Sequence, residues 1–309
     1  MKRMLSVLLV LALLVTAFAS CSSTKKTDNI LLVTSFYPIY IFTSNIVDGI
    51  DGIEVECMAE QNVGCLHDYQ ILSRDAKLIS DADVFIINGA GMEEFLEDVY
   101  LNDENLRVVD SSENIDVIEN CNEHHENHSH DNEEHHEHEH SVNSHIWLAP
   151  ENAIAQVENI ARELSSIYPG YKTEIERNKN SYTERLSALN EELAEAASVL
   201  KGKNIITFHE SYDYLAEAYS FNVIATVEGH EGSEPSAKGL AELTEIINKN
   251  NVSVLFTEPH YKGSAANILC SETGVVICEL NPVITGDGSL TSYEDIMRKN
   301  IDIIVEAVS

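Results

Sequence analysis

The sequence predicts an α/β protein with two Rossmann-like domains, each built on a parallel sheet, joined by one long rigid helix. Three observations lead to this prediction. The chain has 309 residues, more than one hydrophobic core usually serves. Short apolar runs alternate with helical stretches in two separate blocks, 30–170 and 201–309. Between the blocks, residues 172–200 contain neither proline nor glycine.

The first block carries the β-α-β order that is typical of a parallel sheet with helices on both faces. An antiparallel α+β arrangement is the alternative. We expect strands at 30–36, 53–59, 83–89 and 106–110, and helices at 38–49, 70–82 and 92–100. In the second of these helices, Ile71, Leu72, Leu78 and Ile79 are expected to share one apolar side.

An amphipathic helix at 150–169 precedes the linking segment 171–200. Leucines recur there at helical spacing with charges between them, at Leu186, Leu189, Leu193 and Leu200. Such a helix would be a rod of about 45 Å. The second block then predicts strands at 204–208, 222–227, 252–258 and 275–280, with helices at 210–221, 235–250, 264–274 and 291–308.

The first 20 residues are expected to be a signal peptide, because a basic start precedes an apolar run at 5–18 that is too short to span a membrane. Small residues before Cys21 resemble a bacterial lipobox, which predicts lipidation of Cys21 and a tether over 21–29. A plainly secreted form is the alternative. We therefore expect an extracytoplasmic protein that only a lipid anchor holds to the bacterial cell membrane, on its periplasmic or cell-surface side.

The charge of the chain excludes one class of partner. Nineteen basic and 52 acidic residues give a formal charge of −33, which argues against nucleic acid. A tract at 120–143 is acidic, rich in histidine and nearly free of apolar residues, so we expect a disordered loop. Its histidines could bind auxiliary metal ions: His124, His125, His128, His130, His135, His136, His138 and His140. An acidic solubilising loop is the alternative.

Three further histidines stand next to the predicted strands and helices. His67 follows the strand 53–59, His145 precedes the helix at 150, and His209 directly follows the strand 204–208. Ligands of open parallel sheets bind at the carboxyl ends of strands, so the three imidazoles could converge in the cleft between the domains. Imidazole suits zinc and other late first-row divalent ions. The sequence therefore predicts a metal site made by His67, His145 and His209.

Several motifs resemble those of the zinc-binding solute-binding lipoproteins of bacterial metal ABC transporters (cluster A-I, zinc-uptake branch). The motifs that carry the resemblance are "LHDYQILSRDAKLISDADVFIINGAGMEEFLEDV", "SHIWLAPENA", "TFHESYDYLAEAYSF", "EGSEPSAKGLAELTEIINKNNVSVLFTEPHY" and "SYEDIMRKN". The resemblance implies a monomeric receptor that captures Zn²⁺ in an interdomain cleft and delivers it to a permease with its ATPase.

The resemblance also implies that His67, His145 and His209 are the ligands, and it leaves the fourth ligand open. Asn281 stands where relatives often have aspartate, and Leu66 stands where some zinc binders have glutamate. A water or a nearby carboxylate could complete the site. Three nitrogen donors favour Zn²⁺ over Mn²⁺.

Alternative functions are a manganese or other divalent-metal receptor of the same family, and a surface metal buffer or adhesin. A three-histidine zinc hydrolase would need a general base, for which Glu210 is the candidate. The leading interpretation is a receptor and not an enzyme.

The cysteine spacing does not match a structural zinc site. Export permits disulfides. Two pairs could form them, Cys57 with Cys65 and Cys270 with Cys278, which would leave Cys121 without a partner.

Overall fold

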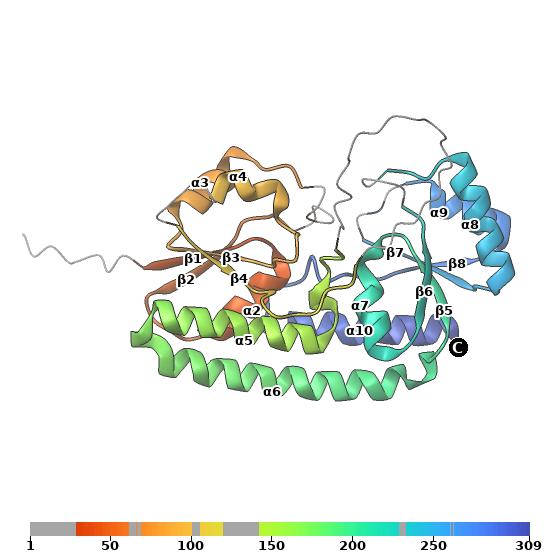
Figure 1. The fold of residues 1–309 in the computed structure, drawn as a ribbon. Coiled ribbons are helices and arrows are strands. Elements are labelled where there is room, and N and C mark those ends of the chain that lie inside the picture. The colour runs from red at the N-terminus through yellow and green to blue at the C-terminus, as the bar shows by residue number, and fades with distance from the viewer. Residues whose placement is uncertain are drawn as a thin grey trace, which may run out of the picture.

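The computed structural model describes residues 29–61, 66, 69–100, 106–119, 142–228, 233–259, 261 and 263–309. Two four-stranded sheets form the centres of the two domains (Figure 1), with the strand orders β2-β1-β3-β4 and β6-β5-β7-β8. Every strand pair is parallel, as predicted, so the antiparallel alternative is wrong. The strands are β1 (Ile30–Thr34), β2 (Ile53–Cys57), β3 (Val84–Ile87), β4 (Arg107–Asp110), β5 (Asn204–Thr207), β6 (Asn222–Thr226), β7 (Val254–Thr257) and β8 (Val276–Glu279).

The helices follow the predicted order, although several are shorter than predicted. They are α2 (Tyr37–Val47), α3 (Ser73–Asp81), α4 (Glu97–Tyr100), α5 (Pro150–Ile167), α6 (Lys172–Ala196), α7 (Asp213–Tyr219), α8 (Ala237–Asn250), α9 (Ala265–Thr273) and α10 (Ser292–Val308). The helix predicted at 92–100 is a 3₁₀ turn, η2 (Glu94–Leu96), followed by the single turn α4. None of the helices in the described part of the chain is long and apolar enough to cross a membrane.

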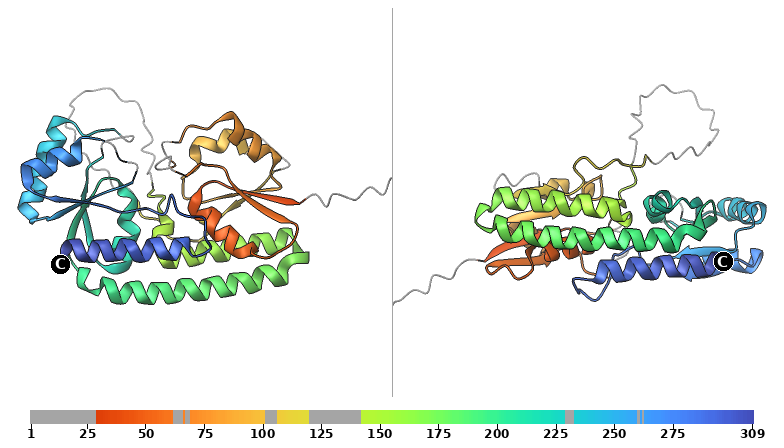
Figure 2. Two further views of the ribbon diagram at one scale, coloured as in Figure 1. Left: turned by 180° about the vertical axis from the view of Figure 1, so that it is seen from behind. Right: turned by 90° about the horizontal axis from the view of Figure 1, so that it is seen from below.

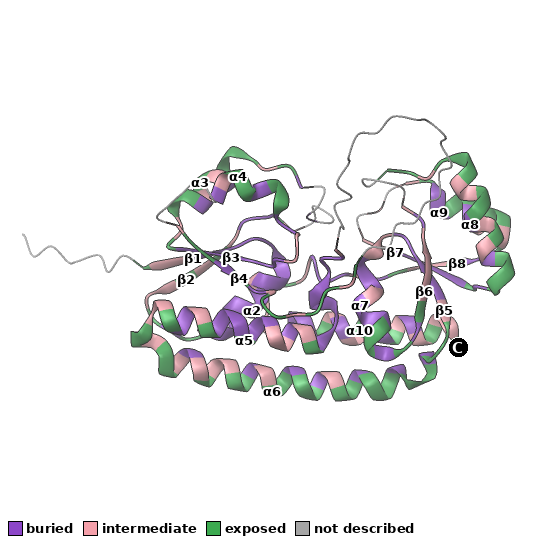
Figure 3. Cartoon of the chain, viewed as in Figure 1, coloured by how far each residue is buried: buried purple, intermediate pink, exposed green. Residues whose placement is uncertain are grey.

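The long helix α6 runs beneath both sheets, alongside α5 (Figure 2). Its 25 residues span about 37 Å. The helix is shorter than the predicted rod because its last turn tightens into the 3₁₀ helix η5 (Ala197–Leu200). The predicted leucines are buried along the face that covers the domains (Figure 3). The α6 helix therefore forms a common base for both sheets.

The two domains share one hydrophobic core. A single cluster of buried side chains extends from β1 and α2 through α6 to α10 and the inner face of the second sheet. At its centre, the Phe42 ring of α2 lies 5.2 Å from the Tyr293 ring of α10 and 6.3 Å from the Tyr182 ring of α6. Separation of the domains would expose these aromatic rings, so we expect the domain arrangement to be fixed.

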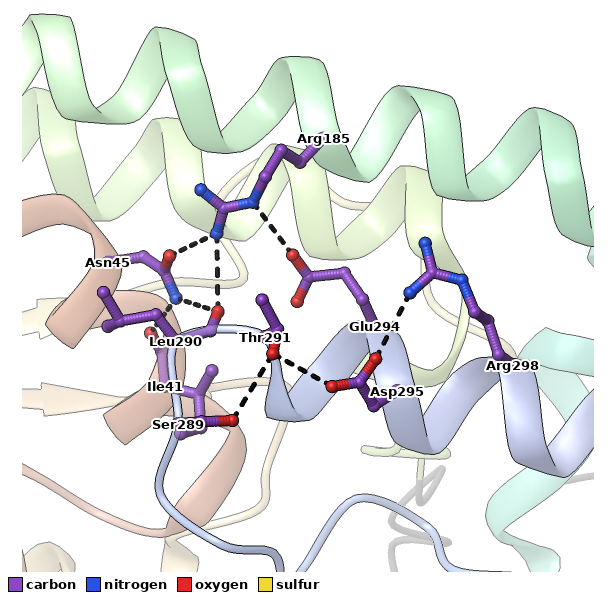
Figure 4. A network of polar contacts seen from close by, with 9 residues as sticks. All are labelled: Ile41, Asn45, Arg185, Ser289, Leu290, Thr291, Glu294, Asp295 and Arg298. Carbon is purple, nitrogen blue, oxygen red and sulfur yellow. Dashed lines mark hydrogen bonds and ion pairs between the residues drawn. The ribbon is translucent and has the colours of Figure 1, made fainter.

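A polar network joins the same three helices at the surface of this core (Figure 4). Arg185 of α6 donates to Glu294 of α10 at 3.1 Å and to Asn45 of α2. Asn45 also donates to the Leu290 carbonyl at 3.0 Å. Nearby, a β carbon at Gly286 would lie only 2.4 Å from the Tyr37 hydroxyl. The segment that leads into α10 is thus closely fitted to α2.

The proposed disulfides are not present in the described part of the structure. Cys57, Cys270 and Cys278 are free cysteines, and Cys65 lies outside the described residues. Cys270 in α9 and Cys278 in β8 do not form the predicted bond, because the two side chains pack with different clusters of buried residues. Cys270 packs with the cluster under α8 and α9, whereas Cys278 packs with the shared core. The Cys57 thiol instead donates to the Ala59 carbonyl at 3.3 Å.

The C-terminal end of the histidine-rich tract also differs from the prediction. Val142 forms an antiparallel bridge with Glu119, and Asn143 is fully buried. The predicted boundary at 143 is therefore too late. The eight histidines of the tract lie outside the described residues, as do Cys121 and the whole segment 1–28 with the predicted signal peptide and Cys21.

Candidate metal centre

The structure brings together two of the three predicted ligands. His145 immediately precedes the 3₁₀ helix η3 (Ile146–Leu148), and His209 immediately precedes the 3₁₀ helix η6 (Glu210–Tyr212). Their rings are 4.9 Å apart at an interplanar angle of 77°, with the two Nε2 atoms 3.3 Å apart. His145 is 1% exposed, and the His209 side chain is 17% exposed. The pair therefore lies where the two domains meet, with limited access from solvent.

The other ring nitrogen of each histidine is held by an oxygen atom. His145 Nδ1 lies 2.9 Å from Asn143 Oδ1, and His209 Nδ1 is paired with the Glu228 carboxylate. An amide oxygen can only accept a hydrogen bond, so His145 Nδ1 carries the proton. The Glu228 carboxylate likewise accepts a hydrogen bond from His209 Nδ1. The two Nε2 atoms therefore face one another while an oxygen holds the opposite nitrogen of each ring, which is the arrangement that metal-binding histidines adopt.

The separation of the two Nε2 atoms matches zinc coordination. Two Zn–N bonds of about 2.0–2.1 Å at a tetrahedral angle place the nitrogens about 3.3–3.4 Å apart. The distance in the structure is 3.3 Å. The two imidazoles are therefore already at the spacing that a tetrahedral zinc ion requires.

Trp147 fixes the orientation of the His145 loop. Its ring is fully buried and lies 5.2 Å from the His145 ring. The indole N–H donates to the Pro282 carbonyl at 2.7 Å, and the Trp147 carbonyl accepts from the Tyr293 hydroxyl at 2.7 Å. The second domain thus holds the histidine loop on two sides of the tryptophan.

Acidic side chains surround His209. Besides Glu228, the carboxyl group of Glu258 lies within electrostatic reach and accepts from Ser211 Oγ at 2.8 Å. Burial raises the pKa of Glu258, and the neighbouring His209 acts in the opposite direction. A cation beside the His209 ring would favour the ionised form of this buried carboxyl group, so the carboxyl group in turn favours a bound cation.

The other predicted site residues are placed differently. The amide nitrogen of Asn281 donates to the Thr285 carbonyl at 2.8 Å, whereas its Oδ1 is buried without a hydrogen-bond partner in the described part of the structure. Leu66 is buried. His67 lies outside the described residues, so its role as a ligand stays a prediction. Within the described ranges, no group of three or more His, Cys, Asp or Glu side chains is arranged to hold a metal ion.

The sequence interpretation did not select Asn143 or Glu228. Glu228 follows β6 at the same sheet edge as His209 follows β5, so the rule that selected His209 could also have found Glu228. Asn143 stands at the end of the polar tract, and apart from its contact with His145 its side chain pairs with groups of the second domain, which no local pattern indicates.

Known proteins resemble this chain along most of its length. Residues 32–307 match the model of a family described as zinc-uptake complex component A, periplasmic. The chain is 32% identical over 301 residues to the zinc-binding lipoprotein AdcA of Streptococcus pneumoniae serotype 4, covering 95% of this chain and 59% of AdcA. It is 32% identical over 295 residues to the high-affinity zinc uptake system protein ZnuA of Bacillus subtilis, covering 93% of this chain and 90% of that protein.

A solved structure of one of these relatives is also similar to this chain in fold. The crystal structure of Zn(II)-bound AdcA from Streptococcus pneumoniae matches with a TM-score of 0.74 and 28% identity, covering 91% of this chain and 58% of that chain. The present chain thus spans only 59% of the length of AdcA. The family match nevertheless covers nearly all of the present chain, with both sheets and both histidine segments. This chain belongs to the family of zinc-uptake complex component A.

Proposed function

We propose that this protein is an extracytoplasmic receptor that binds Zn²⁺ as its cargo and delivers it to an ABC permease for import. The observation that carries this proposal is the 3.3 Å separation of the Nε2 atoms of His145 and His209, each with its Nδ1 held by an oxygen. Nitrogen donors favour Zn²⁺ over Mn²⁺. The zinc-binding relatives AdcA and ZnuA support the same cargo.

His67 is the proposed third ligand, and a water or a nearby carboxylate is the proposed fourth. A site with only three histidine ligands suits a receptor, because the ion must leave the site again when the receptor delivers it to the permease. The proposed partners are the permease and its ATPase, with Cys21 as the lipid anchor.

Chelator competition with purified protein tests the proposal. We expect one tightly bound Zn²⁺ per chain. His67→Ala, His145→Ala and His209→Ala should each lower the affinity by more than about a hundredfold, because loss of a ligand exceeds the 10–100-fold typical of losing its supporting group. His260→Ala, a histidine that we do not assign to the site, is the matched control. Unchanged affinity in the His145 and His209 variants would remove the proposed site.

The histidine-rich tract is proposed as an auxiliary collector of Zn²⁺. Glu119 and Val142 flank the part of the tract that the structure does not describe, and they pair in an antiparallel bridge. Val142 stands three residues before His145. The sequence predicts that this tract is disordered, and a disordered tract binds an ion more weakly than a fixed site because binding must order the chain. Deletion of residues 123–140 should leave the tight site intact and abolish weaker binding. Loss of the tight site would show instead that the tract supplies a primary ligand.

A further inference from the structure

Asn143 makes an unusual number of contacts for one buried side chain. Its Oδ1 accepts from the His145 backbone N–H at 3.0 Å and lies 2.9 Å from His145 Nδ1. Its Nδ2 donates to the Glu210 carbonyl at 2.9 Å and to Asp213 Oδ2 at 3.1 Å. The residue is 0% exposed. One amide thus contacts a candidate ligand with its oxygen and the second domain with its nitrogen.

The backbone of Asn143 is fixed as well. Its N–H donates to the Ile118 carbonyl at 2.8 Å, and its carbonyl accepts from the Tyr214 hydroxyl at 2.6 Å. The same hydroxyl accepts from the Ile118 N–H at 2.9 Å. Tyr214 belongs to α7 of the second domain, so both the main chain and the side chain of Asn143 are tied across the domain boundary.

The partner groups on the second domain lie close to the other candidate ligand. Glu210 directly follows His209, and Asp213 begins α7 at the end of the same turn. Burial raises the pKa of Asp213, and the hydrogen bond from Asn143 acts against this shift. A donor at this position therefore stabilises a half-buried carboxylate on the His209 side of the boundary.

We propose that Asn143 is a positioning residue that fixes the Nδ1–H tautomer of His145 and links its loop to the His209 segment. This inference rests on the proposed function of the two histidines. Only an amide offers an acceptor and a two-proton donor on one short, rigid group. Aspartate at position 143 would still accept from His145, but it would face Asp213 as a like charge. Alanine would remove both interactions.

Zinc affinity and the His145 tautomer test this role in the full chain. Asn143→Ala should lower the affinity for Zn²⁺ by about 10–100-fold. Long-range ¹H–¹⁵N NMR of the zinc-free protein should show that His145 loses its Nδ1–H form. The control is Asn159→Ala, because Asn159 is also a buried amide but donates to the Ser111 and Glu113 carbonyls. The control should lose stability without loss of zinc affinity.

An exchange of the two side chains separates positioning from general destabilisation. Asn143→Asp should keep the Nδ1–H tautomer and weaken zinc binding, because the donors to the second domain are lost. Adding Asp213→Asn should restore most of the affinity, since the new amide at position 213 can donate to the new carboxylate at position 143. If Asn143→Ala does not fold, the zinc affinities of Asn143→Asp and of the double variant Asn143→Asp/Asp213→Asn decide the question.

The possible outcomes are distinct. Wild-type affinity in Asn143→Asp, or no recovery in the exchanged pair, would overturn the positioning role. If His145→Ala and His209→Ala left the zinc affinity unchanged, the proposed function would fail instead. Severe loss in those two variants, with normal binding in Asn143→Asp, would reject the inference alone.

Discussion

Replacement of Arg185 by methionine should test how the two domains are held together. Arg185 contacts both α2 and α10 from the long helix (Figure 4). Its guanidinium carbon also lies 4.7 Å from the centroid of the Tyr182 ring. Methionine keeps the length and the apolar stem of the side chain but removes the charge and all donors. The change therefore isolates the polar network from the core beneath it.

The expected cost follows from the exposure of the two charged partners. The Glu294 side chain is 4% exposed, whereas the Arg185 side chain is 41% exposed. Loss of one partner from a fully buried pair costs about 3–5 kcal/mol. Because solvent screens the exposed guanidinium, we expect Arg185→Met to lower the free energy of unfolding by about 2 kcal/mol. The double variant with Glu294→Met should recover part of this loss, since no unpaired buried charge remains.

Urea unfolding of the zinc-free protein measures these changes. The matched control is Arg298→Met, because Arg298 also joins α10 to α6 through Glu192 at 3.0 Å but both side chains are well exposed. The control should cost less than about 1 kcal/mol. Equal losses in the Arg185 and Arg298 variants would refute the reasoning that the buried partner determines the cost.

The remaining predictions concern packing, pH and thiols. Gly286→Ala should lower the free energy of unfolding by about 2 kcal/mol, because its β carbon would overlap the contact between α2 and α10. Gly170→Ala should leave the free energy of unfolding nearly unchanged, because no atom lies within contact distance of its β carbon. Equal free energies of unfolding in the two variants would contradict this. Burial raises the pKa of Glu93 from 4.5 to about 7, so the folded state binds this proton more tightly than the unfolded state does. The resulting contribution to the free energy of unfolding is fully present below about pH 4.5. It should fall by about 3 kcal/mol as the pH rises to 7. Urea unfolding of wild type and Glu93→Gln across that range should show a smaller decline in the variant, and parallel profiles would count against the assignment. Mass mapping without reduction should find Cys270 and Cys278 as free thiols, and a bond between them would contradict the packing of their side chains in separate clusters.

Much of the fold could be predicted because the chain alternates strongly between apolar runs and amphipathic helices. β3 and β7 are buried along their whole length, as central parallel strands require. Where the pattern was short, the prediction failed. Leu72 was assigned to the apolar side of a helix, but it precedes α3 and is 50% exposed. Periodicity cannot distinguish the last residue of a loop from the first turn of a helix.

The candidate site could be predicted only in part, for a related reason. His145 and His209 stand at the starts of elements, where the topology of parallel sheets places ligands. Asn143 contacts His145 only two residues away, but its link to the second domain runs to residues 67 and 70 positions away, which no local pattern contains. The Cys270–Cys278 prediction failed for the opposite reason, because nearness in sequence does not show whether a helix side chain and a strand side chain pack in the same cluster.

Crystallography of the zinc-loaded protein with anomalous diffraction at the zinc edge tests the central claim most directly. The account predicts one fully occupied zinc ion between His145 and His209, about 2.0–2.1 Å from each Nε2, with Asn143 and Glu228 still bound to the opposite ring nitrogens. A tightly bound zinc ion that touches neither Nε2 atom, or that coordinates an Nδ1 atom instead, would contradict it.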